Sequence, residues 1–322
     1  MRLVRPLLRP LLRPLLRPLL VVLGQSVLVF LIFFAIPGND PAARLAGRGA
    51  PAETIAAVRA EYGLDRSLPV QYAVLMGRLF VTRDLPSFVN RGQLVVPAVL
   101  RAAPVTLGLA GGAALLWCGA GLLIGLARSR RWDGLVLAAG LVGTSIPVFW
   151  LGELVNLVTQ SRYRDWFGWV PPLGVVPGTV GGYLAQMALP CATLAVVFAG
   201  VYGRVLRTSI RAAAEAPHVR VARAKGLANY AVLIRHVLRP ALVPAVALLG
   251  LDLGALLGGG TILVEVVFGL PGLGRLTYTA LTTLDLAMVM ACTIYAAVLV
   301  AVCSALADAA VRWLVPRAYD RG

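Results

Sequence analysis

Several acidic residues stand inside or beside long apolar runs, and three of them are the side chains most able to do chemistry. Asp252 lies in the middle of one run, Glu153 interrupts another, and Glu265 stands at the start of a glycine- and proline-rich stretch. A charge in such surroundings is expensive, and it usually faces a cavity or a partner. The carboxylate of Asp252 could therefore bind an ammonium group, or it could pair with a neighbouring arginine or hydroxyl.

The other reactive residues form no catalytic or metal-binding pattern. His218 and His236 both lie in one basic segment, no H-E-x-x-H motif occurs, and the four cysteines are scattered through apolar runs. Lys225 is the only lysine and does not follow the glycine pattern of a nucleotide-binding G-x-x-x-x-G-K-[ST] loop. These observations predict a protein that is not an enzyme, holds no metal and binds no cofactor or ATP itself.

The composition places these residues in a membrane protein. Of the 322 residues, 59% are hydrophobic and 14% are charged, and the mean hydropathy is +0.83. A soluble domain carries about 45–50% apolar and about 25% charged residues. The net charge of +16 could suggest nucleic-acid binding, but the arginines lie between apolar runs. The charge therefore reports membrane topology, and no nucleic-acid partner is expected.

Six segments are long and apolar enough to cross a bilayer, which requires about 20 residues. A basic stretch precedes the first, but no A-x-A cleavage site follows it, so we expect a retained helix and not a signal peptide. Because only helices satisfy the backbone at these lengths, we predict an all-α membrane protein with six transmembrane helices. The predicted spans are about 19–36, 104–127, 134–160, 184–203, 241–264 and 286–311.

The distribution of arginine predicts that both termini are cytoplasmic. The N-terminus, the 128–133 loop, the 204–240 loop and the 315–322 tail all fall on one side of a six-span chain, and each is rich in arginine. The loop over 37–103 then lies outside the membrane on the opposite face. This topology predicts a multi-pass protein of the bacterial cytoplasmic (inner) membrane, with the lipid bilayer as a partner.

Residues 1–18 form a separate basic arm ahead of the 19–314 membrane domain. Arg-Pro-Leu-Leu repeats four times from Arg5, and a proline at every fourth position opposes a regular helix. The arm could bind anionic lipid headgroups, or it could be a tolerated extension that helps to hold the N-terminus inside.

The segment between the fourth and fifth predicted spans has the pattern of a short helical hairpin. Pro217 suits the first position of a helix, and Gly226 suits its C-terminal cap. A second helix starts near Asn229 and places Arg235 and Arg239 on one face, four residues apart. The unit could be a solvated basic loop, a DNA-reading helix-turn-helix or a docking element for a cytoplasmic partner. Membrane spans on both sides disfavour the DNA-reading alternative.

Several patches together resemble permease subunits of the peptide and nickel branch of ATP-binding-cassette importers. VARAKGL at 221–227 and RHVLRPALVP at 235–244 resemble the cytoplasmic coupling loop of that family. Similar patches are PGNDPA at 37–42, EYGLDRSLPVQY at 61–72, GTSIPVFWLG at 143–152 and LLGGGTILVEVVFGLPGLGRL at 256–276. The resemblance covers nearly the whole chain.

The resemblance implies a type I importer permease fold and a set of partner subunits. A second, related permease subunit would form a heterodimer with this chain, and two ATPase subunits would bind ATP and Mg²⁺. An extracytoplasmic binding protein would deliver small peptides for import by alternating access. Import of nickel chelates or another small solute, and less readily a secondary transporter, are the alternatives.

The resemblance also implies roles for residues of the coupling loop and of the pathway. The residues expected to couple this chain to the ATPases are Glu215, Pro217, Val219, Ala222, Arg223, Ala224, Lys225, Gly226, Leu227, Arg235 and His236. Those expected at the translocation pathway or gate, where 265–274 would form a re-entrant turn, are Asp252, Glu153, Glu265, Phe268, Pro271 and Gly272.

One stretch departs from the family pattern. The family usually shows a basic residue, an aspartate, an aromatic residue and a proline near the sixth span. Here the stretch is Leu284-Asp285-Leu286-Ala287, and only the aspartate remains. Contacts that require the missing arginine are therefore not expected in this chain.

Overall fold

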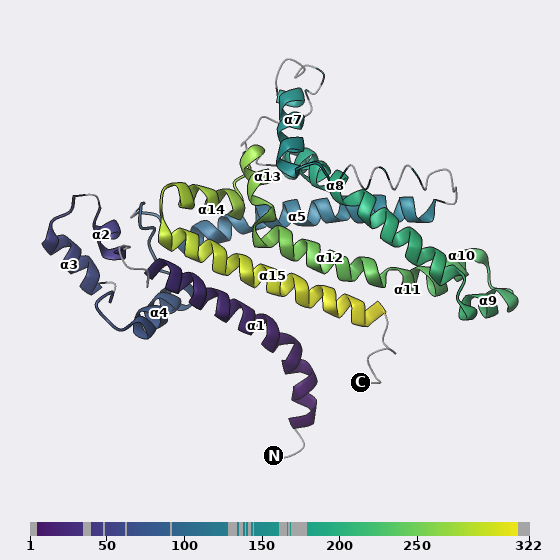
Figure 1. Ribbon diagram of the computed structural model, residues 1–322, viewed down its shortest axis with the longest axis horizontal. Coiled ribbons are helices and arrows are strands. Elements are labelled where there is room, and N and C mark those ends of the chain that lie inside the picture. The colour runs from purple at the N-terminus through teal and green to yellow at the C-terminus, as the bar shows by residue number, and fades with distance from the viewer. Residues whose placement is uncertain are drawn as a thin grey trace. The chain divides into compact units, whose positions relative to one another are not determined.

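The described backbone of this chain is almost entirely helical (Figure 1). The computed structural model describes residues 5–34, 40–47, 49–61, 63–90, 92–127, 145–160 and 179–314, and also 134, 138, 140, 143, 166 and 168. No strand occurs in these ranges, where Pro86 and Leu94 form an isolated bridge. The all-α prediction is confirmed for this part of the chain.

The chain as far as residue 214 combines the long helices α1, α5 and α8 with shorter ones. Its elements are α1 (Arg5–Phe34), α2 (Pro41–Ala46), α3 (Ala52–Glu61), α4 (Leu68–Gly77), the π turn η1 (Arg78–Thr82), α5 (Val95–Leu126), α7 (Val148–Gln160) and α8 (Val180–Ala214).

The second half is more finely divided. Its elements are α9 (Pro217–Ala224), α10 (Asn229–Val232), the π-helical η3 (Leu233–Leu238), α11 (Arg239–Ala241), α12 (Val243–Ala255), the π turn η4 (Leu256–Gly260), α13 (Ile262–Val267), α14 (Leu273–Thr282) and α15 (Leu286–Leu314).

Among the described residues, four helical stretches are long and apolar enough to cross a membrane. They are α5, α8, the combined α12–η4 stretch Val243–Gly260, and α15, while Leu19–Phe34 and Leu68–Thr82 are shorter apolar helices. The four long stretches match the second, fourth, fifth and sixth predicted spans. The first predicted span is helical as far as Phe34, and the third corresponds to α7, with most of 128–144 outside the described residues.

The Arg-Pro-Leu-Leu repeat does not interrupt the first helix, which was not expected. The helix α1 begins at Arg5 and includes all four prolines. A proline removes the hydrogen bond to the carbonyl four residues earlier. Because the spacing here is also four, the lost bonds fall along one stripe of the helix, and the remaining positions of each turn keep theirs.

The fifth predicted span is broken, although a continuous helix over 241–264 was expected. The α12 helix ends at Ala255 and leads into η4, where Gly259 has a φ of 142° and a ψ of −12°. Residues with a side chain rarely adopt this backbone conformation, so position 259 requires a glycine. The triple glycine at 258–260 was the signal for the break.

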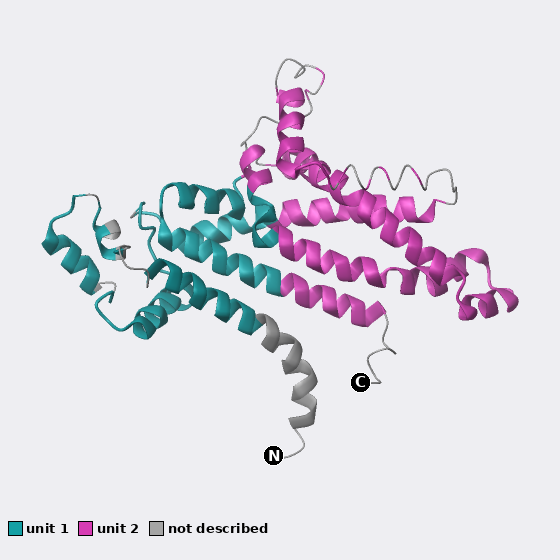
Figure 2. Cartoon of the chain, viewed as in Figure 1, with its two compact units in different colours: residues 1–106, 257–262, 271–301 teal, residues 107–256, 263–270, 302–322 magenta. Residues whose placement is uncertain are grey.

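The chain divides into two compact units, which Figure 2 colours separately. Unit 1 comprises residues 1–106, 257–262 and 271–301, and unit 2 comprises residues 107–256, 263–270 and 302–322. Buried residues of unit 1 come from α1, α4, η1, the 85–88 loop, the start of α5, α14 and the start of α15. In that core the Phe30 ring stacks on Phe34 at 4.8 Å and meets the edge of Tyr72 at 5.4 Å.

Unit 2 is organised around α8. This helix contacts α7, η3, α11 and α12, and its glycine-lined face lies against α5. A Cβ added at Gly121 of α5 would lie 2.7 Å from Tyr202 Cβ, and one added at Gly203 of α8 would lie 2.7 Å from Ile124 Cγ2. Small residues of this kind let two membrane helices approach closely, which is how van der Waals packing holds them in lipid.

Candidate functional site: a basic hairpin and intramembrane acids

The predicted helical hairpin is present, and its turn is defined by backbone geometry. In α9 Pro217 occupies the first turn, where its missing N–H is not needed. Gly226 follows the helix with a φ of +76°. Its N–H donates to Arg223 O at 2.9 Å, and the Leu227 N–H donates to Ala222 O at 3.4 Å. These two bonds are the Schellman motif that ends helices at a left-handed glycine.

The inner face of the hairpin fixes it to the rest of unit 2. Val219 and Ala222 are buried. Their side chains therefore anchor α9 to the rest of unit 2 and do not form part of the exposed surface of the hairpin. The His218 imidazole donates from Nε2 to the His236 carbonyl at 3.2 Å, which joins α9 to η3. The η3 and α11 segments in turn pack on α8.

The outer face of the hairpin is basic and apolar together. Every residue from Arg223 to Tyr230 is exposed, as are Glu215 and Pro217. The exposed fractions of three apolar side chains are 54% for Val221, 44% for Leu227 and 75% for Tyr230. Exposed apolar groups beside charges are typical of a surface that another protein covers. We call the exposed residues 220, 221 and 223–230 the hairpin tip.

The two arginines that were expected to share one face have different surroundings. Arg235 is exposed on η3. Arg239 donates from Nε to Leu314 O and from Nη2 to Trp313 O, both at 3.1 Å, and its guanidinium lies 5.8 Å from the Trp313 ring centre. A cation at the C-terminal end of a helix satisfies carbonyls that have no helical partner. Arg239 thus joins the hairpin to the end of α15, a contact that sequence spacing does not reveal.

Asp252 has a hydroxyl partner, which is one of the two alternatives that the sequence allowed. Tyr202 of α8 donates its hydroxyl to Asp252 Oδ2 at 2.7 Å. Tyr202 is fully buried, and Asp252 is partly exposed. The Tyr202 ring also packs beside Trp117 of α5, at 5.8 Å between centres. This pair therefore sits where α5, α8 and α12 of unit 2 meet.

The remaining pathway candidates lie on α7, on α13 and in the turn after α13. Glu153 is exposed on α7, whereas Glu265 of α13 and Phe268 are buried. The Asn156 amide of α7 donates to Val267 O at 2.8 Å, and a Cβ at Gly152 would meet the Phe268 ring at 3.1 Å. The structure thus places α7 directly against the end of α13.

The segment after α13 turns sharply, as the glycines and the proline predict. The Leu270 N–H donates to Glu265 O and the Gly269 N–H donates to Val266 O, with Gly269 at a φ of +66°. This is again a Schellman motif. Pro271 is exposed and Gly272 is buried, and α14 begins at the next residue. Within the described residues, no three His, Cys, Asp or Glu side chains form a possible metal site.

Asp285 makes contacts that sequence reasoning did not find. It is 4% exposed, and it accepts hydrogen bonds from the Ser87 hydroxyl, from Phe88 N at 3.1 Å and from Met288 N at 3.2 Å. Its carboxylate thus caps α15 and holds the 86–90 loop of unit 1. No arginine takes part in these bonds. The preceding residue, Leu284, has a φ of +60°, which is unusual for a branched side chain.

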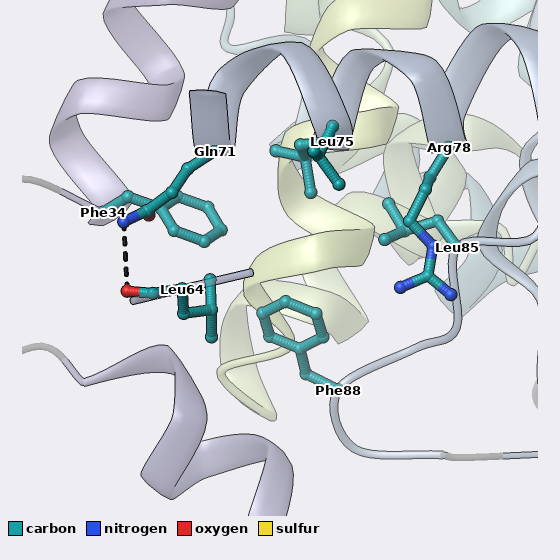
Figure 3. Close-up of a pocket in the computed structure, with 8 residues that line it drawn as sticks. Phe34, Leu64, Gln71, Leu75, Arg78, Leu85 and Phe88 are labelled. Atoms are coloured by element: carbon teal, nitrogen blue, oxygen red, sulfur yellow. Dashed lines mark hydrogen bonds between the residues drawn. The ribbon is translucent and has the colours of Figure 1, made fainter. Parts of the chain in front are cut away.

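A small hollow in unit 1 does not offer a ligand site (Figure 3). It is lined by Phe34, Leu64, Gln71, Val74, Leu75, Arg78, Leu85 and Phe88. The Gln71 amide donates to Leu64 O at 3.1 Å and to Arg66 O at 2.8 Å, and Arg78 forms an ion pair with Asp84 at 3.4 Å. The pKa of Asp84 is lowered mainly by the hydrogen bond from the Thr82 hydroxyl, and Arg78 lowers it further. The polar groups around this hollow therefore already have partners.

Comparison with known proteins identifies the family. Residues 118–319 match the inner membrane component of binding-protein-dependent transport systems, and residues 7–110 match the N-terminal part of such membrane components. A peptide transport system permease protein of Brucella abortus strain 2308 is 34% identical over 275 residues, which cover 84% of this chain and 85% of the relative.

Two further relatives extend this result. The D,D-dipeptide transport system permease of Escherichia coli K12 is 33% identical, over 92% of this chain and 94% of its own length. A glutathione transport system permease of Salmonella typhimurium is 35% identical, over 83% of this chain and 84% of its own length. The chain therefore belongs to the inner membrane components of binding-protein-dependent transport systems, and it is a multi-pass membrane protein.

Proposed function

We propose that this chain is the permease subunit of an ATP-driven importer that carries small peptides into the cell. Its relatives are named for peptide, D,D-dipeptide, oligopeptide and glutathione transport, and all of these cargoes are peptides. The chain itself would not hydrolyse ATP. That reaction would belong to two separate ATPase subunits, and an extracytoplasmic binding protein would deliver the peptide to this chain and a second, related permease.

The observation that carries this proposal is the hairpin tip. A rigid turn, fixed by two capping bonds and by the buried Val219 and Ala222, exposes the residues 223–230 without interruption. A stiff element can pass the motion of a bound partner to the helices behind it, whereas a flexible loop would absorb that motion. The α8 helix, on which η3 and α11 pack, is the element that would receive the motion.

The proposed topology has six spans, with both termini and the hairpin in the cytoplasm of a bacterial cell. In the part of the chain that the structure describes, four stretches have the required length and apolarity. The Leu19–Phe34 part of α1 and the segment that ends with α7 would supply the other two. On this topology the broken backbone at Gly259 and the turn at 268–272 lie near the pathway, since irregular backbone at membrane depth needs protein or water around it.

The experiment is assembly and uptake with the complete set of subunits. The chain is co-expressed with the second permease and the ATPases encoded beside it, purified, and reconstituted with the binding protein in proteoliposomes. We expect co-elution with two ATPase subunits and uptake of a labelled dipeptide or oligopeptide that requires internal ATP. Elution of the chain without ATPases, or equal uptake with and without ATP, would contradict the proposal.

A further inference from the structure

The side chain of Asp252 is only half satisfied by the protein. Oδ2 accepts the Tyr202 hydroxyl, and that is the only hydrogen bond of the Asp252 side chain within the described residues. The ion pairs of the described residues also do not include Asp252. A carboxylate in an apolar helix needs a positive partner or water, because lipid cannot solvate it. Asp252 is partly exposed, and its Oδ1 atom has no such partner among the described residues.

The backbone beyond Asp252 also favours a ligand site. Asp252 lies in the last turn of α12. One turn beyond Asp252 the chain enters η4, whose backbone leaves the helical conformation at Gly259. Broken membrane helices of this kind commonly form the binding sites of transporters.

The chemistry of the pair restricts the size and charge of the ligand. One carboxylate with one hydroxyl provides too few oxygen atoms for a divalent metal ion, and no acidic or histidine cluster lies nearby in the described residues. A primary ammonium needs hydrogen-bond acceptors and one negative charge, and Asp252 Oδ1 supplies both. Tyr202 is fully buried, so its hydroxyl keeps the carboxylate in one orientation.

We propose that the Tyr202–Asp252 pair binds the ammonium group of the cargo during its passage. This inference rests on the proposed function and specifies its cargo, because a peptide with an unmodified N-terminus carries such a group. Asp252 would be the binding residue, and Tyr202 would be the positioning residue that holds Oδ2.

The test compares one peptide in two forms, with a free and with an acetylated N-terminus. Uptake of both is measured in proteoliposomes that contain the complete importer, either wild type or Asp252→Asn. A lost bond to a charged group lowers binding roughly tenfold to hundredfold. We expect a decrease of that size for the free peptide and no change for the acetylated peptide, at whatever rate the wild type carries it. Asp252→Glu should partly restore uptake.

Two other variants separate binding from structure. Tyr202→Phe keeps the buried ring but removes the hydroxyl, and it should weaken uptake of the free peptide less than Asp252→Asn does. Asp308→Asn makes the same change at an exposed acid of α15 and should leave the ratio of the two uptake rates unchanged. Unaltered free-peptide uptake by Asp252→Asn would overturn the inference, as would an equal loss for both peptides. If the wild-type importer carries neither peptide, that result contradicts the proposed function itself.

Discussion

Gly226 shows how a single residue determines the shape of the hairpin. Its φ of +76° lies in the left-handed region, and an added Cβ would meet no atom within 4 Å. A substitution there would strain the backbone without causing a clash. At Asp285 the situation is reversed, because the backbone is ordinary and the side chain makes the essential contacts. The two residues therefore lead to different predictions.

We expect Gly226→Val to insert normally but to uncouple ATP hydrolysis from uptake. A left-handed conformation costs a residue with a Cβ about 1–2 kcal/mol, so the turn would relax and displace the hairpin tip. The measurement is ATP hydrolysed per peptide carried by the reconstituted importer. Gly226→Asn is the matched control, because asparagine tolerates this conformation and should stay close to the wild type. Normal coupling in the valine variant would count against the docking role.

We expect Asp285→Ala to destabilise unit 1 by about 3 kcal/mol or more, since the change leaves three buried donors without their acceptor. Ser87→Ala removes one of these donors and also the acceptor of the Val89 and Asn90 N–H groups, so it should cost about 1–3 kcal/mol. Thermal unfolding of the purified protein in detergent measures both. Equal stability of Asp285→Ala and the wild type would show that the clamp is not important for folding.

At the scale of elements, the break in the fifth span is the feature that most changes the predicted architecture. The α12 helix, η4 and α13 replace a single continuous helix. Schellman turns then end α9 and α13 at glycines, and α14 ends in the same way at Leu284. The connections in the second half of the chain are therefore short and stiff, which suits elements that move as bodies.

Neighbouring glycines of η4 provide a matched test of that break. Gly259 has a φ of 142°, and a Cβ there would meet only Ile262 at 3.6 Å, while a Cβ at Gly258 would meet only Val300 at 3.9 Å. Space is thus available at both positions, and only Gly259 has the unusual φ. We expect Gly259→Ala to lower stability by about 1–3 kcal/mol and Gly258→Ala to be nearly neutral. The measurement is thermal unfolding in detergent. Equal stability of the two variants would show that the break at residue 259 does not require a glycine.

At the scale of the whole molecule, the chain is a multi-pass membrane protein whose proposed orientation depends on the arginine distribution. On the positive-inside rule, the N-terminus, the hairpin and the C-terminus would lie in the cytoplasm. The 37–103 loop would then face the opposite side. Each compact unit contains its own buried residues, and the long helices α5 and α15 contribute to both.

Labelling of single cysteines tests this orientation. In a variant with the four native cysteines replaced by alanine, Leu227→Cys is placed in the hairpin tip and Val89→Cys in the 37–103 loop; both positions are exposed. A membrane-impermeant maleimide should label residue 89 in intact cells and residue 227 only after the membrane is opened. Labelling of residue 227 from outside would show that the orientation is the reverse of the proposed one. The hairpin tip could then not contact an ATPase in the cytoplasm.

Much of the fold could be predicted because it depends on local signals. Runs of apolar residues predict the long helices, and Pro217 with Gly226 predicts both ends of α9, since capping involves residues that are close in the sequence. The family-level function was also accessible from short motifs. The helical conformation of the proline repeat does not follow from the effect of a single proline, because it depends on the stripe that all four share.

The tertiary structure alone decided which distant residues meet. Tyr202 and Asp252 are 50 positions apart, Arg239 and Trp313 are 74 apart, and Ser87 and Asp285 are 198 apart. No sequence period relates such pairs, because the packing of whole helices brings them together. The amino-acid sequence therefore determined the helices, the basic hairpin and the family, since these depend on neighbours along the chain. The structure decided that Asp252 has a hydroxyl partner and that Asp285 serves as a clamp, because those partners are distant in sequence.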